Sequence, residues 1–152
     1  MNVQIARANI ADAEEILGLQ KLAYLSEAEL YNNYGIQPLT ETIDEIKSCF
    51  ETHIILKAVS ESKIVGTVRA FAKDGTCFVG RLAVLPAMQN HGVGASLMNE
   101  VEKYFKPGRF ELFVGTKSSK NIHLYKKSGY SIFKKENYGC GDIEVFYMEK
   151  CL

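Results

Sequence analysis

The sequence lacks long apolar runs, paired cysteines and any surplus of one charge, and these absences exclude several classes of protein. No segment approaches the roughly 18 consecutive apolar residues of a membrane-spanning helix. Residues 1–15 have neither the basic start nor the apolar core of a signal peptide, which predicts a cytoplasmic protein without a membrane partner. At 152 residues and 47% hydrophobic composition, the chain is expected to form one domain spanning residues 1–152.

The four cysteines, Cys49, Cys77, Cys140 and Cys151, include no CxxC pair and no histidine at the spacing of a metal ligand. We therefore expect reduced thiols and no metal site. Cys140 lies in a sequence typical of a turn, where the thiol would be exposed.

The net charge is zero, but the charges are unevenly placed. Residues 12–51 carry 9 acidic and 2 basic residues, whereas the second half of the chain is basic. This pattern is typical of solvated helix faces, or of an anionic ligand over the second half and a cationic one near the first. The basic residues form no stripe with interleaved aromatic residues, which argues against a nucleic-acid partner.

Hydrophobic periodicity predicts the elements of the first half. Residues 3–7 alternate as a strand, and a capping box of Asp12 and Glu15 predicts a helix to about Leu30 with Ile16, Leu19, Leu22 and Ala23 on one face. Residues 31–40 are predicted to be a loop. Thr42 and Glu45 cap a second helix, and three strands over residues 53–85 are joined by polar turns.

The second half predicts a parallel unit followed by a hairpin. A helix over 92–104, with a stripe of Val93, Leu97, Val101 and Tyr104, connects the strand ending at 85 to a strand over 109–116. A short helix from Ser118 or Ser119 and two closing strands follow. The expected fold class is α/β (α+β), with a mixed, mostly antiparallel central sheet, a parallel βαβ unit and helices on both faces.

Gly92 and Gly94 stand at the start of a helix that follows a strand. A helix N-terminus exposes unpaired N–H groups that suit a phosphate, and glycine removes the side chains that would hold it away. Close packing of helix on strand is the alternative explanation. No Gly-Lys-Ser/Thr follows and no third glycine is suitably spaced, which excludes a P-loop and a dinucleotide fingerprint.

The segment LAVLPAMQNHGVGASLM, residues 82–98, resembles the acyl-CoA signature of the GNAT N-acetyltransferase superfamily. The segment NIHLYKKSGY, residues 121–130, resembles the next helix of that family. The order of the elements agrees as well, so the resemblance covers nearly the whole chain. It implies the GNAT acyl-CoA N-acyltransferase fold, acetyl-CoA as co-substrate and acetyl transfer to a primary amine.

The resemblance also implies roles for individual residues. The main chain of Leu82 and Val84 would pair with the pantetheine arm, with the Val84 N–H polarising the thioester carbonyl. Tyr125 would be the general acid, Asn121 would contact the cofactor, and Lys117, Lys120 and Lys126 are weaker candidates for the ribose phosphate. At His91 the family commonly carries Arg or Lys, which places more of the anion binding on the backbone. The full cofactor-binding set is Leu82, Ala83, Val84, Gln89, Asn90, His91, Gly92, Val93, Gly94, Ala95, Ser96, Asn121 and Tyr125.

The general base stays open. The family commonly places it on the strand before the glycines, but Cys77, Phe78 and Val79 stand there. Glu27, Glu29, Asp142, Glu144 and a chain of waters are the alternatives. No serine or cysteine lies in an activating motif, which favours direct attack through a ternary complex.

The acceptor is predicted to be a small amine or an amino acid. The acidic segment 12–51 favours a cationic amine, whereas Arg69 and Arg81 would suit a carboxylate. The candidate substrate-binding residues are Tyr31, Tyr34, Glu27, Arg69 and Arg81, with Tyr24 as a further wall residue, while His53 and His123 are interpreted as structural. The alternatives are a protein N-terminal acetyltransferase and a non-catalytic acyl-CoA-binding module. The closing strand, 142–152, leaves a homodimer open through edge pairing.

Overall fold

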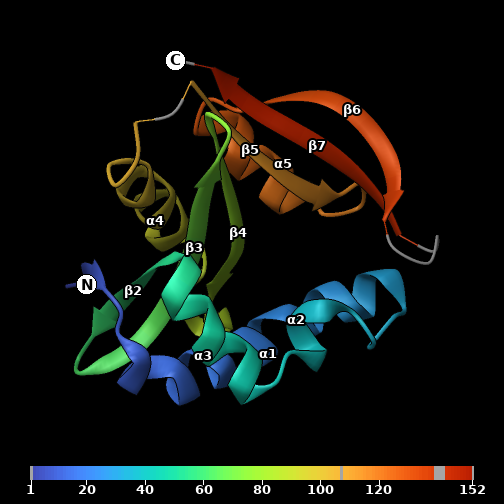
Figure 1. Cartoon of the computed structure of the whole chain (residues 1–152). Helices are drawn as coiled ribbons and strands as arrows, with labels where there is room; N and C mark the ends of the chain where they lie inside the picture. Colours follow the sequence, from blue (N-terminus) through green and yellow to red (C-terminus); the bar gives the residue numbers. More distant parts are fainter. Residues whose placement is uncertain (1, 107, 139–142, 152) are drawn as a thin grey trace.

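The computed structural model describes residues 2–106, 108–138 and 143–151 (Figure 1). Cys140 and Asp142 lie outside these residues. The described strands are β1 (Gln4–Arg7), β2 (Ile54–Ser60), β3 (Lys63–Lys73), β4 (Thr76–Val84), β5 (Arg109–Gly115), β6 (Ser131–Tyr138) and β7 (Ile143–Cys151). The described helices are α1 (Ala13–Tyr31), α2 (Gln37–Thr40), α3 (Ile43–Thr52), α4 (Val93–Glu102) and α5 (Ser119–Lys127). Short 3₁₀ turns stand at Ile10–Asp12 and Pro86–Met88.

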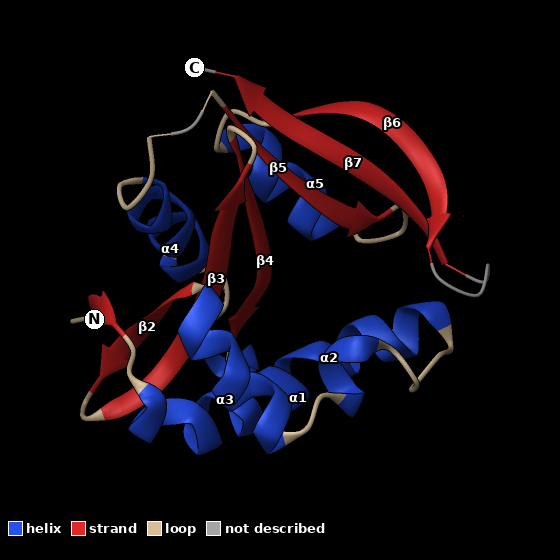
Figure 2. Ribbon diagram, in the orientation of Figure 1, coloured by secondary structure: helices blue, strands red, loops and turns tan. Residues whose placement is uncertain are grey.

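The strands form one mixed sheet in the order β1-β2-β3-β4-β5-β7-β6 (Figure 2). Neighbouring strands pair antiparallel except β4 and β5, which are parallel, so the predicted fold class is confirmed. The parallel pairing covers only the residues Thr76–Phe78 and Arg109–Glu111. Beyond Phe78 the two strands separate, and Figure 1 shows β5, β7 and β6 turning away from β3 and β4.

Alternation along β2 and β3 distributes the core over both faces of the sheet. Ile55 and Ile64 pack with Ile16 of α1 and Ile46 of α3. Their neighbours on the strands, Leu56 and Val65, belong to the larger core that contains Leu97 and Val101 of α4. Helices therefore cover both faces, as predicted.

The local predictions for α1 need two corrections. The capping box is formed by Asn9 and Asp12 around the 3₁₀ turn, one turn earlier than predicted. Glu15 instead accepts a hydrogen bond from the Ile64 N–H at 2.8 Å, which ties α1 to β3. Leu22 is 50% exposed, whereas Gln20 is buried in its place because its amide finds polar partners.

Three further predictions were wrong in detail. Residues 31–40 contain the helix α2, whose first turn accommodates Pro38 because proline lacks only an N–H that is unpaired there. Helix α4 ends at Glu102, so Tyr104 lies beyond the buried stripe and is exposed. Strand β7 lies between β5 and β6, so the edge pairing proposed for a homodimer has no free edge on this strand.

A bulge distorts β4 next to the point where it leaves β5. Thr67 pairs with Ala83 and Arg69 with Gly80, so Arg81 and Leu82 together face the single residue Val68. Arg81 adopts a left-handed backbone with φ 51°. Bulges of this kind bend a strand and redirect its side chains.

Buried polar contacts join α1, α2 and the sheet. The Gln20 amide donates to the Pro38 carbonyl at 3.0 Å and to Glu41 Oε1 at 2.9 Å. Arg69 donates to both oxygens of Glu41, at 3.2 and 2.8 Å. Burial raises the pKa of Glu41, but the hydrogen bonds from Arg69 and Gln20 and the charge of Arg69 outweigh it and hold this pKa below its usual range.

We predict that Glu41→Gln lowers the free energy of unfolding by about 3 kcal/mol at neutral pH, because Arg69 is left buried without a counter-ion. The folded-state pKa of Glu41 lies below the ordinary value of 4.5, so the pair stabilises the fold above that pH. Its contribution is lost as the pH falls through the folded-state pKa. Urea denaturation at several pH values measures the difference, which should shrink in acid. Glu51→Gln, at an exposed position of α3, is the control. Equal stabilities of Glu41→Gln and the parent protein at neutral pH would contradict the prediction.

Candidate functional site

Two hollows open where β4 leaves β5, and they share a boundary. The central cavity, about 420 Å³, is lined by residues that include Tyr24, Glu27, Tyr31, Ile36, His53, Arg69, Phe71, Phe78, Arg81, Leu82, Phe113, Ser118, Asn121, Tyr125 and Tyr138. The groove, about 320 Å³, is lined by residues that include Tyr24, Glu27, Leu82, Ala83, Val84, Gln89, Asn90, Gly92, Val93, Gly94, Ala95, Lys120 and Asn121. Tyr24, Glu27, Leu82 and Asn121 line both hollows, so the groove and the cavity adjoin at these four residues.

The start of α4 forms one wall of the groove. Gly92 precedes the helix with φ 81°, a conformation that L side chains rarely adopt, and its α-carbon faces open space. The Ser96 N–H donates to the Gly92 carbonyl at 3.0 Å and closes the first turn. The N–H groups of residues 92–95 precede that bond and have no partner within the helix. These four residues all line the groove.

Gly94 is explained by packing and not by its backbone conformation. A β-carbon at Gly94 would stand 3.0 Å from the Leu124 Cδ1 atom, so the end of the Leu124 side chain on α5 would have to shift to admit it. Of the two explanations that the sequence leaves open, anion access fits Gly92 and close packing fits Gly94.

The structure does not bring His91 and Ser96 to the groove. Both line a separate hollow beside Val3 and Asn99. The Ser96 N–H is already used within α4, which removes it from the predicted set of anion donors. Gln89 does line the groove, but its side chain donates to the Val84 carbonyl at 3.2 Å and accepts from Lys120 at 3.2 Å.

One edge of β4 faces the groove. The Leu85 N–H donates to the Val65 carbonyl of β3 at 2.9 Å, and alternation turns the main-chain groups of Leu82 and Val84 to the opposite side. In agreement, the Leu82 carbonyl accepts from the Tyr24 hydroxyl at 3.0 Å. Ala83 pairs with Thr67 of β3, so it offers the groove no free main-chain group.

Glu27 lies at the boundary between the two hollows and joins α1 to α5. Ser118 Oγ donates to its Oε2 atom at 2.6 Å and Asn121 Nδ2 donates to its Oε1 atom at 3.1 Å. The Tyr31 hydroxyl lies 2.9 Å from Ser118 Oγ and accepts from the Lys117 N–H at 2.9 Å. We call these contacts of Glu27, Tyr31, Ser118 and Asn121 the α1–α5 bridge.

Ser118 and Gly115 contribute to this bridge, and neither was predicted from the sequence to do so. A β-carbon at Gly115 would overlap the Tyr31 ring, so glycine is required for α1 to approach β5. No spacing in the sequence indicates that residues so far apart meet.

Tyr125 is buried and contributes to the wall of the central cavity. Burial, followed by the nearby Tyr24 and the Glu27 charge, raises the pKa of Tyr125 well above its usual range. Its hydroxyl therefore keeps its proton at neutral pH. Burial likewise raises the pKa of Tyr24 to about 12.

The positions of the candidate general bases distinguish them. Glu29 is exposed and lines neither hollow, and Glu144 is exposed 3.8 Å from Lys135. Asp142 lies outside the described residues. Burial raises the pKa of the Cys77 thiol to about 12, which excludes a ready thiolate. Glu27 is the predicted candidate that the structure places at the boundary of the hollows.

His53 is a further residue that sequence reasoning set aside. It lines the central cavity, with its Nδ1 atom 2.7 Å from Thr52 Oγ1 and its ring packed edge-on against Phe71 at 4.9 Å. Burial and then the charge of Arg69 lower its pKa, so the ring is neutral at neutral pH.

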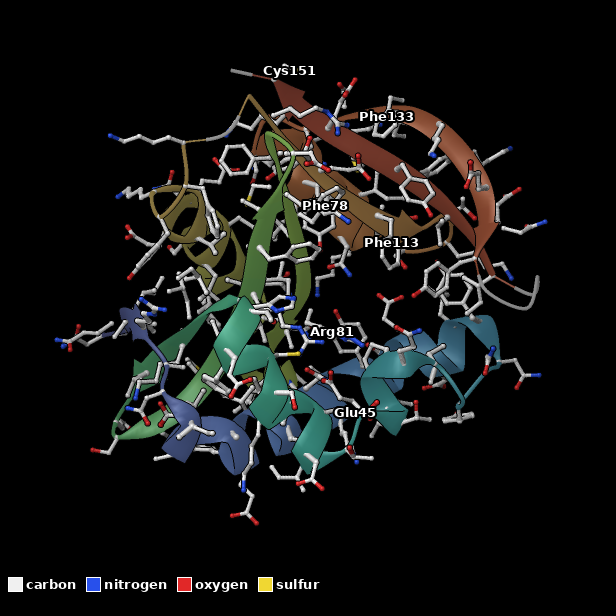
Figure 3. The ribbon with its side chains drawn as sticks, in the orientation of Figure 1. Glu45, Phe78, Arg81, Phe113, Phe133 and Cys151 are labelled. Atoms are coloured by element: carbon white, nitrogen blue, oxygen red, sulfur yellow. The ribbon has the colours of Figure 1, made fainter. Side chains whose placement is uncertain are left out.

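The predicted acceptor-binding residues do not all reach the cavity. Tyr31 and Arg81 line it, and Figure 3 shows Arg81 in the middle of the molecule, below Phe78. Arg69 also lines it, but both of its terminal nitrogens bond to Glu41. Tyr34 is 59% exposed and lies outside the cavity, because its loop turns toward solvent before α2. Of the nine acidic residues in segment 12–51, Glu27 is the one that lines the cavity, so most of this charge belongs to solvated faces or to ion pairs.

Within residues 2–106, 108–138 and 143–151, no group of three histidine, cysteine or acidic side chains could hold a metal ion. No helix in the same ranges is long and apolar enough to cross a membrane.

Comparisons with known proteins identify the family of this chain. The model of the Acetyltransferase (GNAT) family matches residues 19–130. The chain is 30% identical over 132 residues to the protein named "Uncharacterized N-acetyltransferase YjcF" of Bacillus subtilis (strain 168), covering 87% of this chain and 90% of that one.

Two solved structures have the same fold at low sequence identity. The GNAT-family acetyltransferase of Streptococcus pneumoniae is 21% identical, with a TM-score of 0.79 over 99% of both chains. The PaiA N-acetyltransferase of Thermoplasma acidophilum, solved in complex with coenzyme A, is 21% identical, with a TM-score of 0.72 over 100% of both chains.

Replacement by alanine is predicted to have opposite effects on the free energy of unfolding at Gly92, which has a left-handed backbone, and at Gly18, which lies within helix α1. Gly92→Ala should lower the free energy of unfolding by roughly 1–2 kcal/mol, because a β-carbon is strained at a left-handed position. Gly18→Ala, on an exposed face of α1 with open space around it, should raise it by roughly 0.5–1 kcal/mol. Chemical denaturation measures both values, and a shift of the same sign in both variants would contradict the assignment of Gly92.

Proposed function

Because the chain belongs to the GNAT family of acetyltransferases, we propose that it transfers the acetyl group of acetyl-CoA to a primary amine by direct attack in a ternary complex. The observation that carries this proposal is the shared boundary of the groove and the central cavity at Glu27, Leu82 and Asn121. Donor and acceptor can occupy separate hollows and meet there. A covalent acyl-enzyme is unnecessary in this arrangement, and the buried Cys77 has no activated thiolate.

The groove fits an acyl-CoA on two observations. The N–H groups at the start of α4 have no helical partner, and Gly92 leaves open space beside them for a pyrophosphate. The outward main chain of Leu82 and Val84 can pair with the amide groups of a pantetheine arm as a neighbouring strand would. When bound, acetyl-CoA supplies the activated thioester, and the protein supplies position and proton transfer.

The acceptor amine must be neutral when it attacks. Deprotonation at pH 7 costs about 4.6 kcal/mol for a lysine-like amine of pKa about 10.4. For an α-amine with a pKa near 8 it costs about 1.4 kcal/mol. Glu27 is held at the boundary of the two hollows by Ser118 and Asn121. In our proposal its free carboxylate lone pairs take the proton of the amine, directly or through one water.

The leaving thiolate must be protonated. The Tyr125 hydroxyl is protonated at neutral pH, as a phenol is even at its ordinary pKa of about 10. In our proposal that hydroxyl faces the sulfur and donates to it as the carbon–sulfur bond breaks.

Release of free CoA thiol from acetyl-CoA, read with a disulfide reagent, tests the proposed function across amino acids, polyamines, aminoglycosides and short peptides. A protein-only blank is required because the chain contains four cysteines. Turnover of at least one amine is expected. A rise in melting temperature with acetyl-CoA but no thiol release from any acceptor would contradict the proposal and favour an acyl-CoA-binding module.

We predict that Tyr125→Phe lowers kcat by roughly 10²–10⁴-fold, the usual contribution of general acid catalysis. The KM for acetyl-CoA should change little, since the phenyl ring still fills the same space. Tyr104→Phe, which removes an exposed hydroxyl outside both hollows, is the matched control. An unchanged kcat in Tyr125→Phe would remove Tyr125 from the role of acid.

We also predict that Glu27→Gln lowers kcat by roughly 10²–10⁴-fold at neutral pH, because an amide accepts no proton from the amine. Its residual rate should rise with pH, as more of the amine loses its proton to solvent. Glu29→Gln, two residues along the same helix on an exposed face, should behave as the parent protein. A pH–rate profile of Glu27→Gln with the parent's shape and height would count against Glu27 as the base.

A further inference from the structure

The central cavity is lined by Arg81, which has one buried nitrogen atom that no described residue satisfies. The Arg81 Nε atom is buried and has no hydrogen-bond partner among the described residues. Glu41, whose charge acts on Arg81, bonds through both of its oxygens to Arg69. A buried N–H group without a hydrogen bond is costly, and arginine stays charged in proteins. The geometry therefore indicates an anionic group of a ligand beside Arg81.

The same cavity contains an acid without a cationic partner. Glu27 accepts hydrogen bonds from the neutral groups of Ser118 and Asn121. No ion pair of Glu27 exists within the described part of the chain. The charges of Glu27 and Arg81 both act on the Tyr24 hydroxyl, so the two groups lie in the same region of the cavity. Glu111 and Arg69 also line the cavity, but they are paired with Arg109 and Glu41. Glu27 and Arg81 therefore remain to complement a ligand that carries an amine and a carboxylate.

Four aromatic rings supply apolar surface to the cavity. Phe71 and Phe78 stack at 5.3 Å between ring centroids, and Phe113 stacks on Tyr138 at 4.8 Å. All four rings line the cavity. An apolar or aromatic side chain of the ligand would therefore find apolar contacts, whereas a second ammonium group would meet the charge of Arg81.

Resting on the proposed function, we propose that the acceptor is an α-amino acid with an apolar or aromatic side chain, whose carboxylate is bound by Arg81. The guanidinium can bind a carboxylate through two parallel hydrogen bonds, which fixes the orientation of the amino acid. This orientation turns the amine toward Glu27. Because polyamines carry no carboxylate and place an extra cation near Arg81, they are poor acceptors.

Two matched amines test the carboxylate directly in the parent protein. Phenylalanine and phenethylamine share the amine and the ring and differ by the carboxylate. We expect kcat/KM for phenylalanine to be at least about 100-fold higher, since a site built to pair with a polar group rejects the analogue that lacks it. Equal or better turnover of phenethylamine or spermidine would overturn the carboxylate proposal and leave the acetyltransferase intact.

Variants then assign the effect to one residue. Arg81→Gln should lower kcat/KM for phenylalanine by at least about 100-fold, and Arg81→Lys should retain part of the activity because it keeps the charge. Arg7→Gln, at an exposed position of β1 outside the cavity, should change nothing. Circular dichroism establishes that the variants are folded. A discrimination between the two amines that survives in folded Arg81→Gln would overturn the role of Arg81.

A binding measurement separates this inference from the proposed function. Calorimetry in the presence of CoA compares N-acetylphenylalanine with N-acetylphenethylamine as product analogues. Tighter binding of the carboxylate, lost in Arg81→Gln, supports the inference even if no amine is turned over, an outcome that would contradict the proposed function alone. Equal or undetectable binding of the two compounds would overturn the inference whatever the activity.

Discussion

The structure depends on the separation of β4 from β5 after three paired residues on each strand. A continuous parallel pairing would bury the outward main-chain groups of β4 between two strands. Instead the Leu82 carbonyl accepts from Tyr24 and the Val84 carbonyl accepts from Gln89, so side chains satisfy part of the edge while it stays reachable. The same separation leaves the space between α1 and β5 that forms the central cavity. The bulge at Arg81 and Leu82 adds to the divergence by bending β4.

An opened sheet needs a connection across its gap, and the α1–α5 bridge provides one. Tyr31 approaches β5 closely because Gly115 has no side chain, and Glu27 is bonded to Ser118 and Asn121 of the neighbouring helix. The bridge holds together two parts of the sheet that share few direct contacts. It also fixes Glu27 in one orientation, so the same contacts that stabilise the gap also position a carboxylate at the boundary of the two hollows.

The sequence was informative where local patterns decide the structure. Periodicity predicted the strands and the long helices, and Gly92 with Gly94 marked the start of α4 correctly because the left-handed backbone at Gly92 favours glycine and Gly94 packs closely against Leu124. It failed where a distant partner decides. Gln20 is buried instead of Leu22 because Glu41 and Pro38 accept its amide hydrogens. Asp12 does not cap α1, since its carboxylate accepts from the Asn9 N–H at 3.0 Å and from Lys57 at 2.9 Å. The order in which β7 and β6 join the sheet and the isolation of Arg81 also follow from contacts that no single segment contains.

The backbone at Arg81 is an argument for the importance of its side chain. Glycine would adopt φ 51° without strain, whereas a residue with a β-carbon costs roughly 1–2 kcal/mol in the left-handed region. Partial burial also removes solvation from the Arg81 side chain. This burial, followed by the charge of Arg69, lowers the pKa of Arg81. Neither cost is offset by a hydrogen bond donated from its Nε atom within residues 2–106, 108–138 and 143–151. Strain and desolvation at one residue, beside a cavity that holds a free carboxylate, are better explained by a ligand that completes the site than by a contribution to the stability of the fold.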